Sequence, residues 1–132
     1  MTLYERLIVL QDETYRDFLV KLVPNILPET VIGVRTPALR ALAREVYESE
    51  DREVFLNDLP HRYYEENLIH FFMIARIRDF DVCVQAVDRF LPYVDCWPVS
   101  DQSSPAVFRK NRAKLLPHVR RWIDTLSKRR WP

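Results

Sequence analysis

A tryptophan and an aspartate lie close together in the stretch VDCWPVSDQSSP, residues 94–105. Trp97 precedes Pro98, which disfavours helical backbone at the tryptophan and suits the first position of a helix, so Trp97 is predicted to be the N-cap residue. Asp101 then falls on roughly the same helix face. Such a carboxylate can stabilise a developing cation while the indole packs against a ligand. The spacing is also typical of a buried tryptophan beside an aspartate that favours the helix dipole.

Positive charge is concentrated in the last part of the chain. Residues 105–132 contain nine Lys and Arg against one acidic residue, whereas residues 1–104 contain 11 Lys and Arg against 18 Asp and Glu. This segregation gives one end of the molecule a positive field that attracts a polyanion such as a phosphate backbone. A solvated basic terminus would show the same composition. The residues predicted to point outward and to contact nucleic acid are Arg109, Lys110, Lys114, Arg120 and Arg121.

The apolar residues of the basic segment follow helical spacing, which predicts the faces that turn inward. Two consecutive helices would then present basic outer faces directly after the Trp97–Asp101 pair, an arrangement compatible with a phosphate backbone that runs past it. The predicted inward residues are Val107, Phe108, Leu115 and Leu116 in the first helix, and Val119, Trp122, Ile123 and Leu126 in the second.

Other kinds of catalytic site have little support in the sequence. His61, His70 and His118 are scattered, and none pairs with a cysteine at the spacing of zinc ligands. His70 adjoins the apolar stripe of a predicted helix and is interpreted as a half-buried, hydrogen-bonded histidine. Glu65 and Glu66 fall in a first helical turn, where carboxylates favour the dipole, and acid–base work is the alternative. We expect neither a metal nor a cofactor.

The elements that position these residues are predicted to be helices. One glycine and the absence of Asn-Gly and Asp-Gly pairs leave few sites for hairpin turns, while apolar residues recur at steps of three and four. Thr36 and Ser104, each followed by a proline, and Asp51 and Asp79 are predicted caps. The predicted fold class is all-α, with helices near residues 3–22, 36–48, 51–58, 62–77, 80–91, 98–103, 105–116 and 118–127.

Prolines that follow apolar helix ends suggest a repeat. They occur at Pro24, Pro60, Pro92 and Pro117. This irregular spacing is close to that of paired-helix repeats, which run at roughly 34 to 47 residues. We therefore predict an α-solenoid of HEAT-like repeats that forms one domain over residues 1–132, with a compact helical bundle as the alternative.

The composition places the chain among soluble proteins. Hydrophobic residues make up 48% and charged residues 30% of it. The first residues, MTLYERLIVLQDE, carry acids among the apolar positions and do not resemble a signal peptide. Cys83 and Cys96 are predicted to be free thiols in a reducing compartment. We expect a cytoplasmic protein that does not enter the membrane.

Three stretches of the sequence resemble the AlkD-like DNA alkylation repair family. They are VIGVRTPALRALARE at 31–45, LPHRYYEENLIHFFMIARIRDFD at 59–81, and FLPYVDCWPVSDQSSPAVFRKNRAKLLPHVRRWI at 90–123. The Gly-Val-Arg-Thr-Pro stretch and the Trp-x-x-x-Asp stretch are the most specific of these motifs. The resemblance covers nearly the whole chain in the same order.

The resemblance implies a curved solenoid that binds duplex DNA and a glycosylase that excises cationic alkylated purines such as 7-methylguanine and 3-methyladenine. Asp101 aligns with the catalytic aspartate of the family, which would stabilise an oxocarbenium-like sugar. Trp97 aligns with a family tryptophan that would pack on the deoxyribose. The family contacts the sugar-phosphate backbone without a closed base pocket, so its preference for cationic lesions would come from their lability.

The sequence departs from the family in two places. Cys96 stands where the family commonly has asparagine, and the chain ends at SKRRWP, where family members continue through further helices. We therefore expect the N-terminal part of a longer family fold. An exposed solenoid end would favour self-association, since terminal repeats normally carry a polar outer face. The alternative to a glycosylase is a non-catalytic HEAT-like module that binds DNA or a protein.

Overall fold

The structure is a computed structural model that describes residues 2–22, 26–93 and 105–130, with the backbone alone for 125–130. The described residues form α-helices and short 3₁₀ turns and contain no strand, which confirms the all-α prediction and agrees with a helical repeat fold. The helices are α1 (Leu3–Val9), α2 (Glu13–Leu22), α3 (Thr36–Glu48), α4 (Arg52–Asn57), α5 (Tyr64–Ile74), α6 (Phe80–Phe90), α7 (Ala106–Lys110) and α8 (Arg112–Arg130). The 3₁₀ turns are η1 (Pro28–Thr30) and η2 (Leu91–Tyr93).

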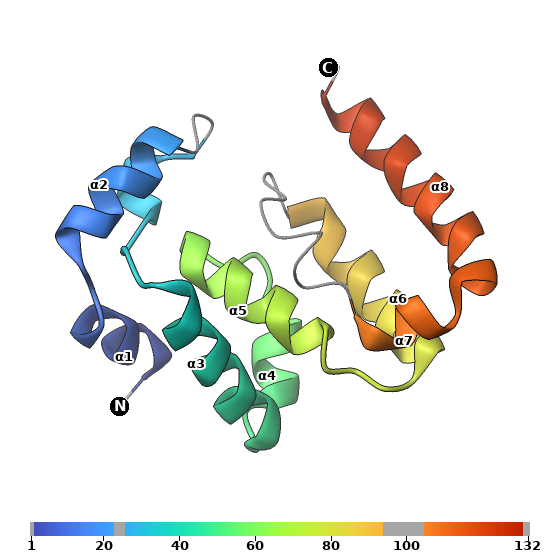
Figure 1. Cartoon of the computed structure of the whole chain (residues 1–132), viewed down its shortest axis with the longest axis horizontal. Coiled ribbons are helices and arrows are strands. Elements are labelled where there is room, and N and C mark those ends of the chain that lie inside the picture. Colours follow the sequence, from blue (N-terminus) through green and yellow to red (C-terminus); the bar gives the residue numbers. More distant parts are fainter. Residues whose placement is uncertain (1, 23–25, 94–104, 131–132) are drawn as a thin grey trace.

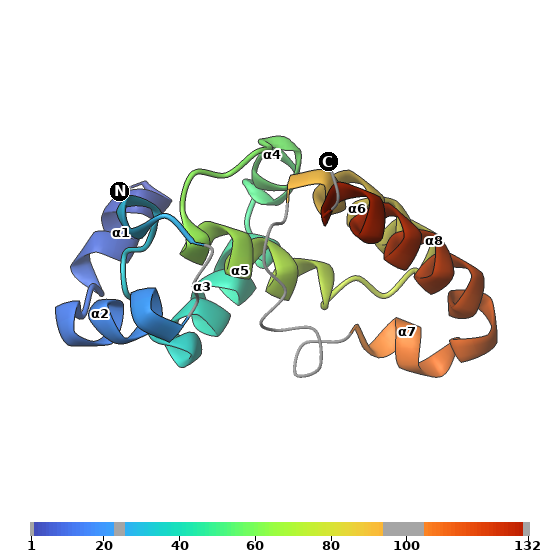
Figure 2. The same cartoon turned by 90° about the horizontal axis from the view of Figure 1, so that it is seen from above.

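The helices follow one another along the long axis of the molecule in chain order (Figure 1). α1 and α2 lie at one end, α3 and α5 pack closely in the middle, and α8 forms the other end, which the second view also shows (Figure 2). The fold is therefore elongated, with two end helices far apart.

One continuous cluster of buried apolar side chains joins α1 to α7. The end helices contribute little to this cluster: α8 packs against it through the partly buried Leu115 and Trp122, and the described residues of α2 lie outside it. Burial of each of these side chains is worth roughly 1.5–3 kcal/mol, so the middle of the molecule carries most of the stability. Members from successive helices are Leu7, Leu39, Leu56, Met73, Phe90 and Phe108.

The predicted helix at 3–22 is wrong in one respect, because the chain turns after Leu10 and begins a second helix at Glu13. Asp12 explains the break. Its side chain accepts a hydrogen bond from the backbone N–H of Tyr15 at 3.0 Å, and its own N–H donates to the carbonyl of Gly33 at 2.8 Å. These two bonds take Asp12 out of the helical pattern and start the next helix.

The predicted boundary at Pro117 is also wrong, because α8 continues through this proline and the break falls at Asn111 instead. The Asn111 side chain donates to the carbonyl of Val107 at 2.8 Å. This hydrogen bond satisfies a carbonyl group near the end of α7, so the helix can end there without a further turn. Pro117 removes one helical hydrogen bond from α8. Packing of Leu115 and Trp122 on the core holds the two sides of Pro117 in one helix.

The predicted caps have mixed outcomes. Asp79 caps α6 as predicted, since its carboxylate accepts from the N–H of Val82 at 3.0 Å. Thr36 is the first residue of α3 rather than its cap, and Asp51 precedes α4 without a capping hydrogen bond from its side chain. The predicted cap Ser104 and the predicted helix at 98–103 lie outside the described residues.

Candidate nucleic-acid interface

The predicted catalytic residues Trp97 and Asp101, together with Cys96, lie outside the described residues. The elements on either side of them are described. Phe90 and Leu91 are buried before the segment, and Pro105 is buried where the chain re-enters the described part. α6 and α7 pack against each other, so the described residues on the two sides of this segment belong to the same core.

The predicted phosphate contacts of α7 are exposed on a helix whose other side is buried. Val107 and Phe108 are buried as predicted, and Arg109 and Lys110 point to solvent in the last turn of α7. A cation at a helix C-terminus also interacts favourably with the dipole. α7 therefore turns its charged side outward, and its positive charge is available to a ligand.

The first half of α8 continues the basic surface. Lys114, Arg120 and Arg121 are exposed, and Leu115 and Trp122 pack toward the core as predicted. The prediction that Leu116 and Ile123 face inward is wrong, because they are 52% and 60% exposed. Helical spacing allows two adjacent apolar strips on α8, and only the strip of Leu115 and Trp122 meets the core. Leu126 lies among the residues whose side chains are not described.

Arg121 also joins α8 to α6. Its guanidinium donates to both carboxylate oxygens of Asp88, with Nη1–Oδ1 and Nη2–Oδ2 distances of 2.7 and 3.3 Å, and Trp122 Nε1 donates to the same carboxylate at 2.8 Å. Burial alone would raise the pKa of Asp88, but the hydrogen bonds from Arg121 and Trp122 outweigh it and lower the pKa. Arg121 therefore positions α8, and its charge is shared with Asp88.

A cluster of aromatic rings supports the same junction. Phe108 of α7 lies between Phe80 of α6 and Trp122 of α8, at ring-centroid distances of 5.7 and 5.8 Å. His118 adds a ring 6.0 Å from both Phe80 and Trp122. Such pairs contribute about 0.5–1.5 kcal/mol each beyond their buried area, so they hold the basic helices against α6.

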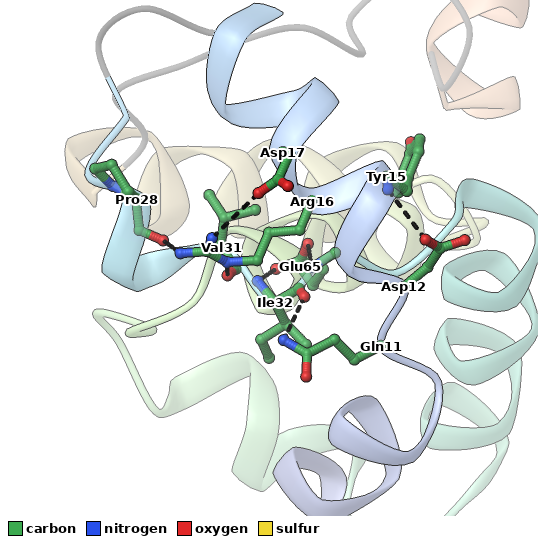
Figure 3. Close-up of polar contacts among 10 residues, drawn as sticks. Gln11, Asp12, Tyr15, Arg16, Asp17, Pro28, Val31, Ile32 and Glu65 are labelled. Atoms are coloured by element: carbon green, nitrogen blue, oxygen red, sulfur yellow. Dashed lines mark hydrogen bonds and ion pairs between the residues drawn. The ribbon is translucent and has the colours of Figure 1, made fainter.

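A buried carboxylate that the sequence did not single out for this role fixes the other half of the scaffold. Glu65 at the start of α5 is fully buried and accepts a hydrogen bond from the backbone N–H of Ile32 at 2.9 Å (Figure 3). It also accepts from the backbone N–H groups of Gly33 at 2.9 Å and Val34 at 3.4 Å. Its role is therefore structural rather than dipolar or acid–base. The one glycine of the sequence, Gly33, could have indicated this site. Its φ of 94° turns the backbone so that three successive N–H groups point at one acceptor.

Arg16 secures the carbonyl side of the same loop. Its guanidinium donates to the carbonyls of Val31 at 2.9 Å and Pro28 at 2.7 Å, and Gln11 donates to the carbonyl of Ile32 at 2.9 Å (Figure 3). The loop between η1 and α3 thus has its N–H groups bound to α5 and its carbonyls bound to the α1–α2 region. It ties three parts of the fold together.

His61 and His70 form a second internal polar contact. Their facing nitrogens lie 2.8 Å apart, and the rings stack between Phe55 and Phe90 at centroid distances of 4.3 and 4.0 Å. His70 is hydrogen-bonded as predicted, but it is 1% exposed and therefore fully buried rather than half-buried. Burial lowers the pKa of His61 to about 4 and that of His70 to about 3, so both are neutral at pH 7.

Among the described residues, Cys83 is a structural thiol. Cys83 is buried, and burial raises the pKa of its thiol to about 12, which leaves no thiolate at neutral pH. In the part of the chain that the structure describes, no three His, Cys, Asp or Glu side chains group as a metal site would require.

None of the described helices has an apolar stretch of the length needed to cross a membrane.

A comparison with known protein families gives a match for this chain. The model of the family described as "DNA alkylation repair enzyme" matches residues 14–131, which include α2 to α8, the Trp97–Asp101 pair and the exposed cations of α7 and α8. No curated protein and no solved structure matches the chain. The match runs across nearly the whole sequence and leaves α1 and the residues up to Glu13 outside it.

Proposed function

The chain belongs to the DNA alkylation repair enzyme family, and from this we propose that it acts on alkylated duplex DNA as a glycosylase of cationic purines. The observation that carries the proposal is the family match over residues 14–131, because it includes both the Trp97–Asp101 pair and the basic helices that follow it. 7-Methylguanine and 3-methyladenine are the substrates that fit the proposed chemistry.

The proposed chemistry uses the charge of the lesion. An alkylated purine already carries a positive charge, so the bond between C1′ and the base nitrogen can break with its electron pair leaving on the purine, which becomes neutral. C1′ becomes oxocarbenium-like, and Asp101 would stabilise that charge and orient the water that adds to C1′ and loses its proton. Trp97 would pack on the deoxyribose. Neither a metal nor a cofactor takes part in these steps.

The proposed DNA contact is the basic surface of α7 and α8. Arg109, Lys110, Lys114 and Arg120 are exposed and would bind phosphates, while Arg121 would add charge and hold α8 in place through Asp88. The support is their exposure on helices whose opposite sides pack on α6 and the core. Phosphate contacts of this kind give affinity without sequence preference, which suits an enzyme that searches for lesions.

The second candidate function is a non-catalytic module that binds duplex DNA. The same exposed cations favour it, because they can bind phosphates without any chemistry. The presence of Asp101 argues against it, since a carboxylate that faced DNA would repel phosphates and would have no use in simple binding.

Measurement of base release separates the two functions. Duplex DNA that carries 7-methylguanine is incubated with an excess of the protein, and the freed base is quantified over time. We expect release by the wild-type chain and a 10²- to 10³-fold slower rate for Asp101→Asn, the effect typical of losing one charge-stabilising group. The matched control is Asp81→Asn, which neutralises an exposed aspartate on α6 and should leave the rate unchanged.

The outcomes are distinct. Equal rates for the wild type and Asp101→Asn would remove Asp101 from the chemistry. Duplex binding without any release would replace the glycosylase by the binding module. Circular dichroism of each variant confirms that the helices are intact, so that a slow rate reports on chemistry rather than on folding.

A further inference from the structure

The two neighbouring histidines connect α4 to the helices beside it. His61 belongs to the loop between α4 and α5, and its ring stacks on Phe55 of α4 at a centroid distance of 4.3 Å. His70 belongs to α5, and its ring stacks on Phe90 at the end of α6 at 4.0 Å. The contact of 2.8 Å between His61 Nε2 and His70 Nδ1 therefore joins α4 and its loop to α5 and α6.

The contact is suited to two neutral rings. One of the two facing nitrogens must donate and the other must accept, so a proton added to the accepting nitrogen breaks the hydrogen bond. Among the described residues, nothing hydrogen-bonds the other nitrogens, Nδ1 of His61 and Nε2 of His70. A proton added there leaves a charged N–H group without an acceptor between aromatic rings, which is unfavourable.

The charged groups around the pair do not reverse this preference. Asp58 on the loop favours a positive charge on His61, and Arg89 of α6 disfavours one on His70. Glu66 of α5 is the other acidic group of this region and interacts with Asp58. Burial outweighs the effect of Asp58, so the pKa of both rings lies below its usual value.

The two rings differ in how readily they can reach water. His70 is fully buried on α5, whereas His61 is half-buried on a loop. α4 is only six residues long, and a helix of that length is not stable by itself. It packs on α3, inserts Leu56 into the core and lies to one side of α5 (Figure 2). Loss of the His61 ring therefore removes one of the contacts that hold α4.

We propose that the His61–His70 contact is an acid-sensitive switch: when the pair takes up a proton from solvent, His61 moves out with its loop and α4 separates from the core, while α3, α5 and α6 stay packed. The opened molecule exposes Phe55 and Leu56 and binds protons as free imidazoles do, so opening becomes more favourable below a pH of about 6.5. No covalent bond changes. The switch depends on neither DNA binding nor base excision.

Native-state hydrogen exchange of the full chain at pH 7 and pH 5 tests the proposal, with each rate divided by the intrinsic rate at that pH. We expect the amides of α4 to be less protected than those of α5 at pH 7, because α4 opens locally. Their protection should fall about tenfold or more by pH 5, because opening takes up protons. The internal control is α2, which contains no histidine and whose local opening should not depend on pH.

Two variants connect the effect to the histidines. Replacement of both His61 and His70 by glutamine should make α4 exchange independent of pH, because the amide side chains do not titrate in this range. The matched control is Glu53→Gln, whose side chain is 71% exposed on α4 and which should keep the pH dependence of the wild type. Circular dichroism at both pH values shows whether each variant keeps its helices.

Each result bears on the proposal. Protection of the α4 amides that stays the same at pH 7 and pH 5 would overturn it. Equal protection of α4 and α5 would also overturn it, because α4 would then open only with the whole molecule. A pH dependence that persists in the glutamine variant would assign the effect to other groups and overturn it as well. The wild-type comparison of α4 with α5 decides the matter even if the double variant does not fold.

Discussion

Two carboxylates join helices in this molecule, and they do so in opposite surroundings. Glu65 is fully buried and binds the backbone N–H groups of a loop more than 30 residues earlier in the chain. Asp88 has a side chain that is 37% exposed and binds the side chains of Arg121 and Trp122. If the buried carboxylate is lost, water cannot take its place as the acceptor for the loop N–H groups. A surface ion pair is screened by solvent and contributes little to the free energy of unfolding.

The difference teaches how stability and function are divided along the chain. The α3–α5 region is fixed by buried apolar packing and by Glu65, so it forms the rigid part of the scaffold. α8 is attached through Asp88 and a few aromatic rings, and its charged side chains up to residue 124 are exposed to solvent. Changes on α8 should therefore alter binding more than folding.

The largest effect on folding is expected for Glu65→Gln. The amide keeps one acceptor oxygen but turns an NH₂ group toward the loop N–H groups, which leaves buried donors unsatisfied. We expect a loss of about 3–5 kcal/mol in the free energy of unfolding, measured by urea denaturation. Glu53→Gln, at an exposed position of α4, should change stability by less than about 0.5 kcal/mol. A loss below 1 kcal/mol for Glu65→Gln would place the strength of this junction elsewhere.

Gly33→Ala tests the loop side of the same junction. Gly33 has φ of 94°, and an added Cβ would lie 2.5 Å from Cβ of Arg16 and 2.8 Å from the carbonyl oxygen of Asp12. Strain and overlap together should cost about 2–3 kcal/mol in the free energy of unfolding. Thermal denaturation checks this, and an unchanged midpoint would mean that the loop can adopt another conformation.

The His61–His70 pair predicts a loss of stability in acid. Burial, the charge of the other histidine and Arg89 hold the pKa of His70 at about 3, and burial holds the pKa of His61 at about 4 despite Asp58. Below pH 6.5 the two histidines bind protons in the unfolded chain but stay neutral in the folded chain, so the free energy of unfolding falls as the pH falls. His70 alone should contribute a loss of about 2 kcal/mol between pH 7 and pH 5.

Urea denaturation at several pH values measures this slope. Replacement of both His61 and His70 by glutamine should flatten it. Burial raises the pKa of the Glu66 carboxyl above its usual range, so Glu66 acts in the opposite direction as the pH falls, and the comparison is therefore made between variants at each pH. A slope that persists in the double variant would contradict the assignment.

Asp88→Asn should have the smallest effect on folding and a local one. The ion pair is exposed, so we expect a loss of about 0.5–1 kcal/mol. Hydrogen exchange gives a sharper test than global stability. The amides of α8 should exchange faster in the variant while those of α5 keep their rates. Faster exchange in both helices would show that the two junctions are one cooperative unit.

The sequence predicted those parts of the fold that depend on local pattern. The apolar periodicity of α5 and α6 gave helices close to those observed. Asp79 was correctly predicted as a cap, and its partner Val82 is only three residues away in the chain. Glu65 shows where this reasoning fails. A carboxylate in a first helical turn has a local explanation in the dipole, while its partners, Ile32 and Gly33, come close only in the folded chain.

The basic surface was predicted only in part, because some of its features follow from local pattern and others depend on contacts between distant residues. Exposure of Arg109 and Lys110 followed from the burial of Val107 and Phe108 on the other side of α7. Leu116 fits the helical spacing as well as Leu115 does, and only the position of α6 and α7 decides which of them is covered. The pairing of Arg121 with Asp88 likewise depends on how α8 crosses α6.

The most direct test of this account is the salt dependence of binding to an unmodified DNA duplex. The test variant replaces Arg109, Lys110 and Lys114 by glutamine. The matched control replaces three arginines that are each paired with a carboxylate, Arg6, Arg44 and Arg52, by glutamine and so makes the same change in net charge. The plot of log K against log salt concentration should be less steep by about 2–3 for the test variant and unchanged for the control. Equal slopes for the two variants would contradict the proposal that α7 and α8 bind DNA.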